Sequence, residues 1–282
     1  MNTKFNFKQF GFIFAAFIII CIGNIIIVAQ DKAERRDFCQ NNNWSWNDKQ
    51  SVNETREMTM PAVNLLTVDG KNNGGISVKG ENRSDVLIRA CVQAWANSTD
   101  LAKQNLDNIR IEKGSNIFAE SSSSDKNWSV SYEILVPLQT NLRLVAQNGG
   151  INISTVDGTI EFETKNGGVS LKYLAGDVKG KTTNGGLSVK LLGNSWKGEG
   201  IDVETKNGGV NVSMDENYAA NFETRTVNGG IKSEINELQV EKKTDEQRGW
   251  YQQNKKIIKA INGGGAKVRI VTTNGGIIIR KN

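Results

Sequence analysis

The tripeptide Asn-Gly-Gly recurs along the sequence and constrains the fold more than any other feature. It begins at Asn73, Asn148, Asn166, Asn184, Asn207, Asn228, Asn262 and Asn274. Between Asn148 and Asn228 the successive copies are 18, 18, 23 and 21 residues apart. A period of this length is typical of proteins built from stacked supersecondary units. The tripeptide is therefore either a ligand loop used many times or the corner of a repetitive structure.

The chemistry of the tripeptide favours a corner. Asn tolerates left-handed backbone angles and Gly adopts them without steric cost, so Asn-Gly suits a tight change of direction. The second Gly lets neighbouring backbones approach or lets a strand begin with a bulge. Between corners, stretches such as "TIEFETK" and "GVSLKYL" alternate apolar and polar residues, which is the period of a half-buried strand. The sequence therefore predicts an all-β fold.

Two architectures satisfy this rhythm. In a β-solenoid or β-helix-like repeat, each unit is one coil with its Asn-Gly-Gly corner stacked on the next. The Asn residues and the threonines two positions before them would then form ladders along the stack; these are Thr164, Thr182, Thr205, Thr226 and Thr272. In an antiparallel meander or sandwich, each Asn-Gly is instead a hairpin turn. Repetition favours the solenoid, but periodicity alone leaves the alternative open.

Two stretches depart from the repeat, and two more near the C-terminus predict local features. Residues 98–110, "STDLAKQNLDNIR", suit a short helix or a loop, and residues 234–258 suit an outlying hairpin or loop. Gly263–Gly265 lack the Lys and the following helix of a phosphate-binding loop, which predicts a wide turn. The last strand, "GGIIIRKN", ends in charged residues that would guard an exposed sheet edge.

The N-terminus has the parts of a secretory signal. Lys4 and Lys8 precede an apolar run that ends at Ala29, the expected last residue before cleavage. Because residues 10–29 could also span a bilayer, an uncleaved anchor is the alternative. We expect three regions: a signal peptide or anchor over 1–29, a polar and poorly regular lead over 30–60, and a β-strand repeat domain over 61–282. Either form predicts export to the periplasm, cell envelope or extracellular space.

Composition narrows the chemistry further. Without residues 1–29 the chain has 33 basic and 30 acidic residues, a formal charge of +3, and no basic run typical of nucleic-acid binding. The chain has no histidine, which excludes histidine-based catalysis. Cys39 and Cys91 remain after the leader and predict a disulfide in an oxidising compartment, with two buried free thiols as the alternative. We expect no metal, cofactor or catalytic residues.

Two groups of side chains are candidates for binding. Carboxylates alternate with apolar residues along the strands, which predicts that they face solvent beside lysines; they are Glu161, Glu163, Asp202, Glu204 and Glu223, with Lys165, Lys179 and Lys206. Aromatic residues cluster before the repeats, at Trp44, Trp46, Trp95, Trp128 and Tyr132. They favour a core or a cap over a terminal repeat, with a sugar-binding platform as the alternative.

Several segments resemble a known family. "NNGGISVKGENRSDVLIRACVQAWA", "WSVSYEILVPLQTNLRLVAQNGGINIS" and "INGGGAKVRIVTTNGGIIIRKN" look like the bacterial "putative adhesin" family of β-strand repeat proteins, a domain of unknown function. The resemblance covers residues 56–282. It implies an exported, non-enzymatic envelope scaffold or adhesin-like protein with an unknown glycan or protein partner. A polysaccharide-acting enzyme on a β-helix, and a membrane-anchored envelope sensor that retains residues 10–29, are the alternatives.

Overall fold

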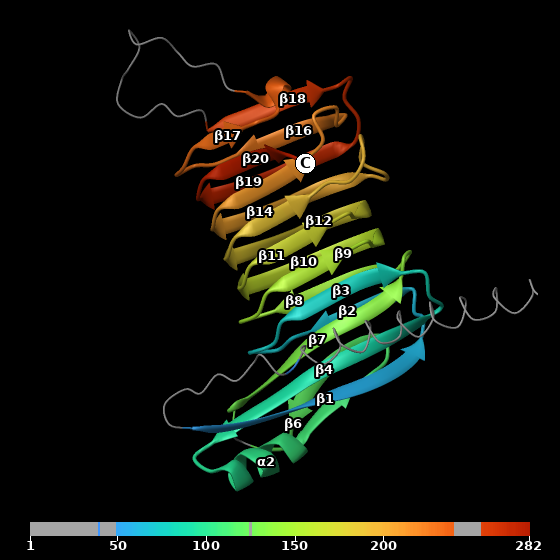
Figure 1. Ribbon diagram of the computed structural model, residues 1–282, viewed down its shortest axis with the longest axis vertical. Coiled ribbons are helices and arrows are strands. Elements are labelled where there is room, and N and C mark those ends of the chain that lie inside the picture. The colour runs from blue at the N-terminus through green and yellow to red at the C-terminus, as the bar shows by residue number, and fades with distance from the viewer. Residues whose placement is uncertain (1–38, 40–48, 124–125, 240–254) are drawn as a thin grey trace, which may run out of the picture. The chain divides into compact units, whose positions relative to one another are not determined.

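The structure is a computed structural model that describes residues 39, 49–123, 126–239 and 255–282. From residue 49 onward, the described residues belong to one compact unit made of two ten-stranded sheets (Figure 1). The predicted signal peptide or anchor and most of the predicted lead segment lie outside the described residues. Among the residues that are described, no helix is long and apolar enough to cross a membrane.

The first sheet contains the strands that follow the stacked corners, together with three longer strands from residues 50–137. In spatial order they are β1 (Gln50–Pro61), β4 (Asp85–Ala96), β7 (Trp128–Pro137), β3 (Ile76–Glu81), β9 (Ile151–Ser154), β11 (Val169–Lys172), β13 (Leu187–Lys190), β15 (Val210–Met214), β20 (Ile277–Lys281) and β17 (Ile231–Ser233).

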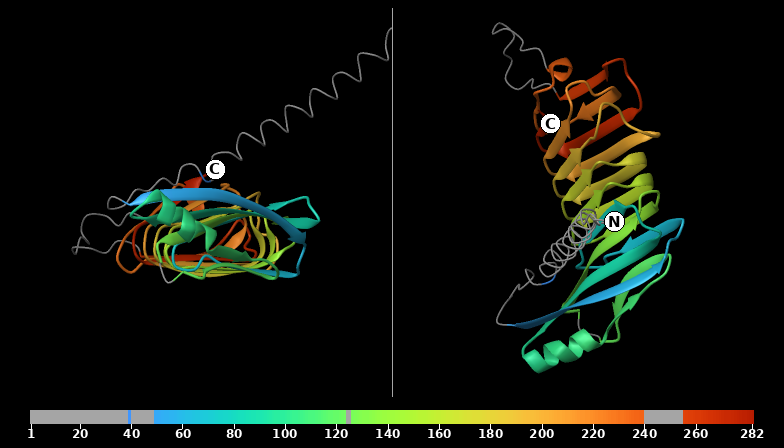
Figure 2. Two further views of the ribbon diagram at one scale, coloured as in Figure 1. Left: turned by 90° about the horizontal axis from the view of Figure 1, so that it is seen from below. Right: turned by 45° about the vertical axis from the view of Figure 1, so that its right-hand side comes forward.

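The second sheet contains the strands that lead into the corners, together with two strands from residues 109–121. Its order is β18 (Lys256–Ile261), β16 (Ala220–Arg225), β19 (Lys267–Asn274), β14 (Gly200–Asn207), β12 (Ala175–Asn184), β10 (Asp157–Asn166), β8 (Asn141–Ala146), β2 (Leu65–Asp69), β6 (Asn116–Ser121) and β5 (Ile109–Glu112). Figure 2 shows the two sheets facing each other. Their inward aliphatic side chains form one continuous core.

The all-β prediction is confirmed, but the solenoid prediction is not. Both sheets are mixed, with antiparallel pairs β1–β4 and β4–β7 in the first sheet and β16–β18 and β5–β6 in the second. Two facing mixed sheets fit the sandwich alternative better than a β-helix. The repeats themselves do not form a meander of hairpins, because β10, β12 and β14 pair in parallel. From β8 to β15 consecutive strands lie in different sheets, so they are not neighbours there.

The corners stack directly on one another. A Cβ atom on Gly167 would lie 2.1 Å from the carbonyl oxygen of Gly149, so only glycine permits this approach of two backbones. The Asn side chains form the predicted ladder: Asn166 donates to Asn148, and Asn184 to Asn166, each over 2.8 Å. The Asn amides are therefore occupied by one another, and the corner is a structural element.

The threonines stack in register as predicted, Thr164 beside Thr182 and Thr182 beside Thr205. Thr164, Thr182 and Thr205 are buried, but their hydroxyls donate to backbone carbonyls of the neighbouring corner rather than to one another. The distances, from Oγ1 to the carbonyl oxygens of Gly149, Gly167 and Gly185, are 2.9, 2.8 and 2.7 Å. Each hydroxyl thus satisfies a partly buried carbonyl of the neighbouring corner.

The N-terminal part is more regular than predicted. Residues 50–61 form the 12-residue strand β1, so the irregular lead expected over 30–60 is wrong for residues 50–60. The charged and apolar residues of this segment do not alternate regularly, so the sequence did not indicate a strand there. The strand pairs along its whole length with β4. Residues 99–107 form helix α2 (Thr99–Asp107), capped by the Ser98 hydroxyl, which accepts from the Leu101 amide over 3.3 Å.

The C-terminal strands do not lie at an edge. β19 lies between β14 and β16, and β20 lies between β15 and β17, so the expected edge guard at the end of the chain is wrong. The 234–258 insert contains the short 3₁₀ helix η2 (Asn236–Leu238) and the start of β18; residues 240–254 lie outside the described part. Gly263–Gly265 form the turn into β19 with positive φ angles, as predicted.

Candidate binding surfaces

The outer face of the second sheet carries alternating charges. Strand register places one residue from each of six neighbouring strands side by side: Arg143, Glu161, Lys179, Asp202, Arg269 and Glu223. The sign changes at every step, so each interior charge has opposite charges on both sides. We call these six residues the charge-alternating row. Opposite charges on directly paired strands stabilise a sheet.

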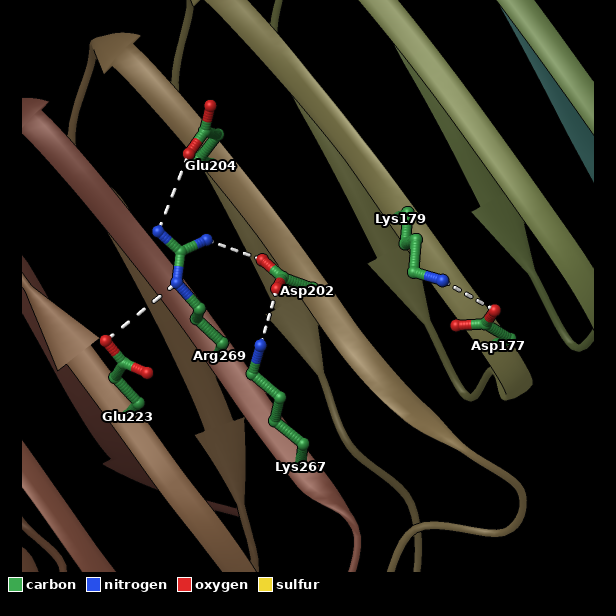
Figure 3. Close-up of polar contacts among 7 residues, drawn as sticks. All are labelled: Asp177, Lys179, Asp202, Glu204, Glu223, Lys267 and Arg269. Carbon is green, nitrogen blue, oxygen red and sulfur yellow. Dashed lines mark hydrogen bonds and ion pairs between the residues drawn. The ribbon is translucent and has the colours of Figure 1, made fainter.

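Asp202 is the centre of the closest contacts in this row (Figure 3). Its two carboxylate oxygens accept from Arg269 Nη1 over 2.5 Å and from Lys267 Nζ over 2.8 Å. Arg269 also lies 3.7 Å from Glu204 and 3.9 Å from Glu223. Burial by itself raises the pKa of Asp202, but the hydrogen bonds and charges of Lys267 and Arg269 outweigh it and lower the pKa below its usual value.

The predicted outward carboxylates are thus confirmed as surface residues of one sheet face. Glu161, Glu163 and Glu204 are exposed, and Asp202 and Glu223 are half-buried. Lys179 donates to Asp177 over 2.8 Å (Figure 3), and this hydrogen bond raises the pKa of Lys179. Lys165 and Lys206 are exposed near the corners. The alternation along each strand predicted which side chains face solvent. It could not predict the order of positive and negative charges across the strands, because that order depends on which strands are neighbours.

The outer face of the first sheet has a different character, which sequence reasoning missed. In β9, β11, β13, β15, β20 and β17, every charged residue is basic: Lys172, Lys190, Lys232, Arg280 and Lys281. The remaining outward positions include Asn152, Ser170, Ser188 and Asn211, which register places in one row. The signal in the sequence is the lysine that ends "GGVSLK" and "GGLSVK".

A groove lies where the chain returns from the first sheet to the second. Its volume is about 750 Å³, and its lining includes Leu138, Tyr173 and Leu192. Leu192 is 64% exposed and Leu138 is 41% exposed. The charged residues of the lining are Glu81, Arg83, Asp157 and Lys197, two of each sign. The groove is therefore apolar with a balanced charge.

The aromatic residues that the sequence grouped together lie in different environments in the structure. Tyr132 is 1% exposed in the core, and Trp128 packs against that core, which favours the core interpretation over a sugar platform for these two residues. Burial raises the pKa of the Tyr132 hydroxyl well above its usual value. Trp95 is half-buried, and Trp44 and Trp46 lie outside the described residues.

The predicted disulfide is present. Cys39 and Cys91 are both disulfide-bonded, and both are buried, at 4% and 2% exposure. A disulfide is typical of proteins in oxidising compartments. In the described part of the chain, no three His, Cys, Asp or Glu residues are grouped so that they could hold a metal ion.

Comparisons with known proteins give distant structural matches. A "putative cell adhesion protein" from Clostridium sporogenes is 11% identical, with a TM-score of 0.43 over 81% of this chain and 100% of that one. A "putative adhesin" from Bacteroides fragilis is 10% identical, with a TM-score of 0.28 over 81% and 97%. A "putative lipid binding protein" from Parabacteroides distasonis is 10% identical, with a TM-score of 0.27 over 80% and 96%. No family model and no curated protein matches the chain.

Proposed function

We propose that this protein is an exported, non-enzymatic β-repeat protein that acts as an adhesin-like binding scaffold in the bacterial cell envelope. The observation that carries the proposal is the in-register stacking of the repeats, which sets outward side chains in straight rows across neighbouring strands. Rows spaced by about 4.8 Å, the distance between paired strands, present the same chemistry repeatedly to an extended partner. The unknown partner is an envelope glycan or protein.

The arrangement of carboxylates supports a non-enzymatic role. A glycoside hydrolase needs two acids that face each other across a cleft, one of them able to donate a proton. Here the acids of the charge-alternating row lie on one face of a sheet, and Asp202 accepts hydrogen bonds from two cations that favour its ionised form. A polysaccharide-acting enzyme is therefore the less favoured alternative.

The disulfide supports export. It connects Cys39, ten residues after the expected cleavage position, to Cys91 in the middle of β4. Such bonds persist in the periplasm and outside the cell, where the environment is oxidising. The alternative, an anchored envelope sensor, shares this requirement and differs only in the fate of residues 10–29.

Two measurements on the full-length gene product test the proposal. Cell fractionation with mass spectrometry of the N-terminus should find a chain that begins near Gln30 outside the cytoplasm; an intact Met1 in membranes would support the anchored sensor instead. The secreted form should co-sediment with isolated cell envelopes and release no reducing ends from envelope polysaccharides. Sugar release without stable binding would contradict the non-enzymatic proposal.

A further inference from the structure

We infer that the outer face of the first sheet binds an anionic polysaccharide, laid across strands β9, β11, β13, β15 and β20. This inference rests on the proposed function and names the partner class for it. The binding residues would be Lys172, Lys190 and Arg280, with hydrogen bonds from the neighbouring row of Asn and Ser side chains. We call this surface the basic face.

The two sheets differ in how they handle charge. The five strands of the basic face contain four basic and no acidic residues. On the second sheet, the acids and bases of the charge-alternating row follow one another strand by strand. Lys281 is paired with Glu216 over 3.4 Å, but Lys172, Lys190 and Arg280 have no ion pair among the described residues, so the basic face keeps an excess of positive charge for an external anion to balance.

One row on the basic face concentrates this excess. Register aligns Lys79, Ser154, Lys172, Lys190, Ser213 and Arg280 across β3 to β20. Lys79 pairs with Glu81 over 3.0 Å. Within the described residues, Lys172, Lys190 and Arg280 form no ion pair, and the Lys190 ammonium lies 5.4 Å from the Tyr173 ring.

The side-by-side placement of Lys172 and Lys190 lowers the stability of the sheet. The two residues lie directly opposite each other on adjacent parallel strands, where like charges destabilise a sheet. Serine occupies the same row at Ser154 and Ser213, so the stack accommodates a neutral residue there. The lysines are therefore better explained by an anionic partner than by the fold.

The neighbouring row of Asn and Ser side chains supplies hydrogen-bonding groups and a shallow depression for a ligand. Asn152, Ser170, Ser188 and Asn211 line a shallow depression of about 360 Å³ together with Gly168 and Gly186, the second glycines of two corners. A Cβ atom on Gly168 or Gly186 would have its nearest neighbour at 3.6 or 3.5 Å, an ordinary contact distance. Stacking does not require glycine there, whereas an extended sugar chain gains from the absence of a side chain.

The chemistry of this face favours a polysaccharide over a nucleic acid. Binding of single-stranded nucleic acid combines basic residues with aromatic rings on which bases stack. No aromatic residue occurs in β9, β11, β13, β15, β20 or β17, and the ring beside the row, that of Tyr173, contacts the Lys190 ammonium. Short hydroxyl and amide side chains beside lysines instead match the hydroxyl and acidic groups of a charged glycan.

The test measures binding of the secreted chain to polygalacturonate, with dextran and oligo-deoxythymidylate as comparison polymers. The variant Lys172→Ser/Lys190→Ser places in both strands the residue already present at Ser154 and Ser213. The matched control is Lys179→Ser/Lys181→Ser, which removes the same charge from the second sheet, where both lysines are ion-paired. Circular dichroism and the melting temperature establish that both variants are folded.

We expect polygalacturonate to bind the native chain and dextran not to bind. The Lys172→Ser/Lys190→Ser variant should weaken binding at least tenfold, and the control less than about threefold, with both affinities falling as salt screens the charges. Equal weakening by the two variants, tighter binding of oligo-deoxythymidylate, or no binding of polygalacturonate would overturn the inference. If envelopes still co-sediment with the native chain in the last case, the proposed function stands without this partner.

Discussion

The two glycines of each corner differ in how much space surrounds them. In the corners that begin at Asn166, Asn184, Asn207 and Asn274, the backbone beside the first glycine is so close that any side chain would collide with it, whereas a Cβ at the second glycine meets only ordinary contact distances. The Asn before them is held by its neighbours in the ladder. At the scale of single residues, the first glycine and the Asn serve the stack, and the second glycine does not.

This difference gives a matched pair of substitutions. Gly185→Ala places its Cβ 2.1 Å from the carbonyl oxygen of Gly167, whereas Gly186→Ala meets nothing closer than 3.5 Å. We expect Gly185→Ala to lower the free energy of unfolding by about 2 kcal/mol or more, as overpacking does. Gly186→Ala should change it by less than about 0.5 kcal/mol, the range of an unstrained surface change. Equal losses in urea unfolding would contradict the stacking of the corners.

Asp202 predicts a pH dependence. Its pKa in the folded chain is below the ordinary value of about 3.9, so its contribution to stability is complete above that value and disappears as the pH falls through the folded pKa. Asp202→Asn should therefore lower the melting temperature at pH 7, and the difference from the native chain should shrink toward about pH 2. The control is Glu161→Gln, in the same row but without an ion pair among the described residues. A difference that is constant with pH would contradict this assignment.

At the scale of elements, the sequence predicted individual strands and a helix from local patterns, but it did not predict the order of the strands in each sheet. The alternation in "TIEFETK" predicts a strand, and Ser98 with the apolar positions after it suits the helix found at α2. The insertion of β19 and β20 between earlier strands could not be predicted, because their local sequence is the same repeat whichever neighbours they have. Likewise, β1 lacks clean alternation because its stability comes from pairing with β4.

The inserted strands predict the effect of a truncation. Among the strands that the structure describes, β17 pairs with β20 alone, and β16 pairs with β19 and β18. Removing residues 267–282 should therefore expose amides of Ala220–Arg225 and Ile231–Ser233 to hydrogen exchange, while Val169–Lys172 in β11 stays protected. Exchange unchanged in β16 and β17 would show that the last two strands are not their neighbours.

At the scale of the whole molecule, the register of the repeats determines both faces. Residues 161 and 202 could be assigned to a solvated face from the sequence, but the basic face required the register that aligns Lys172 with Lys190. A shift of one residue would turn the outward side chains inward. The stacked corners, the charge-alternating row and the basic face therefore depend on one claim, that neighbouring repeats pair in parallel and in register.

Disulfide trapping tests this claim most directly. Ser170 and Ser188 are register partners on β11 and β13, and Asn211 follows on β15. Paired strands are about 4.8 Å apart, within the range that a disulfide bridges, and alternate strands about twice that, which it does not. Under mild oxidation, peptide mapping should find a rapid cross-link in Ser170→Cys/Ser188→Cys and none in Ser170→Cys/Asn211→Cys. A cross-link only in the second variant, or in neither, would contradict the stacking.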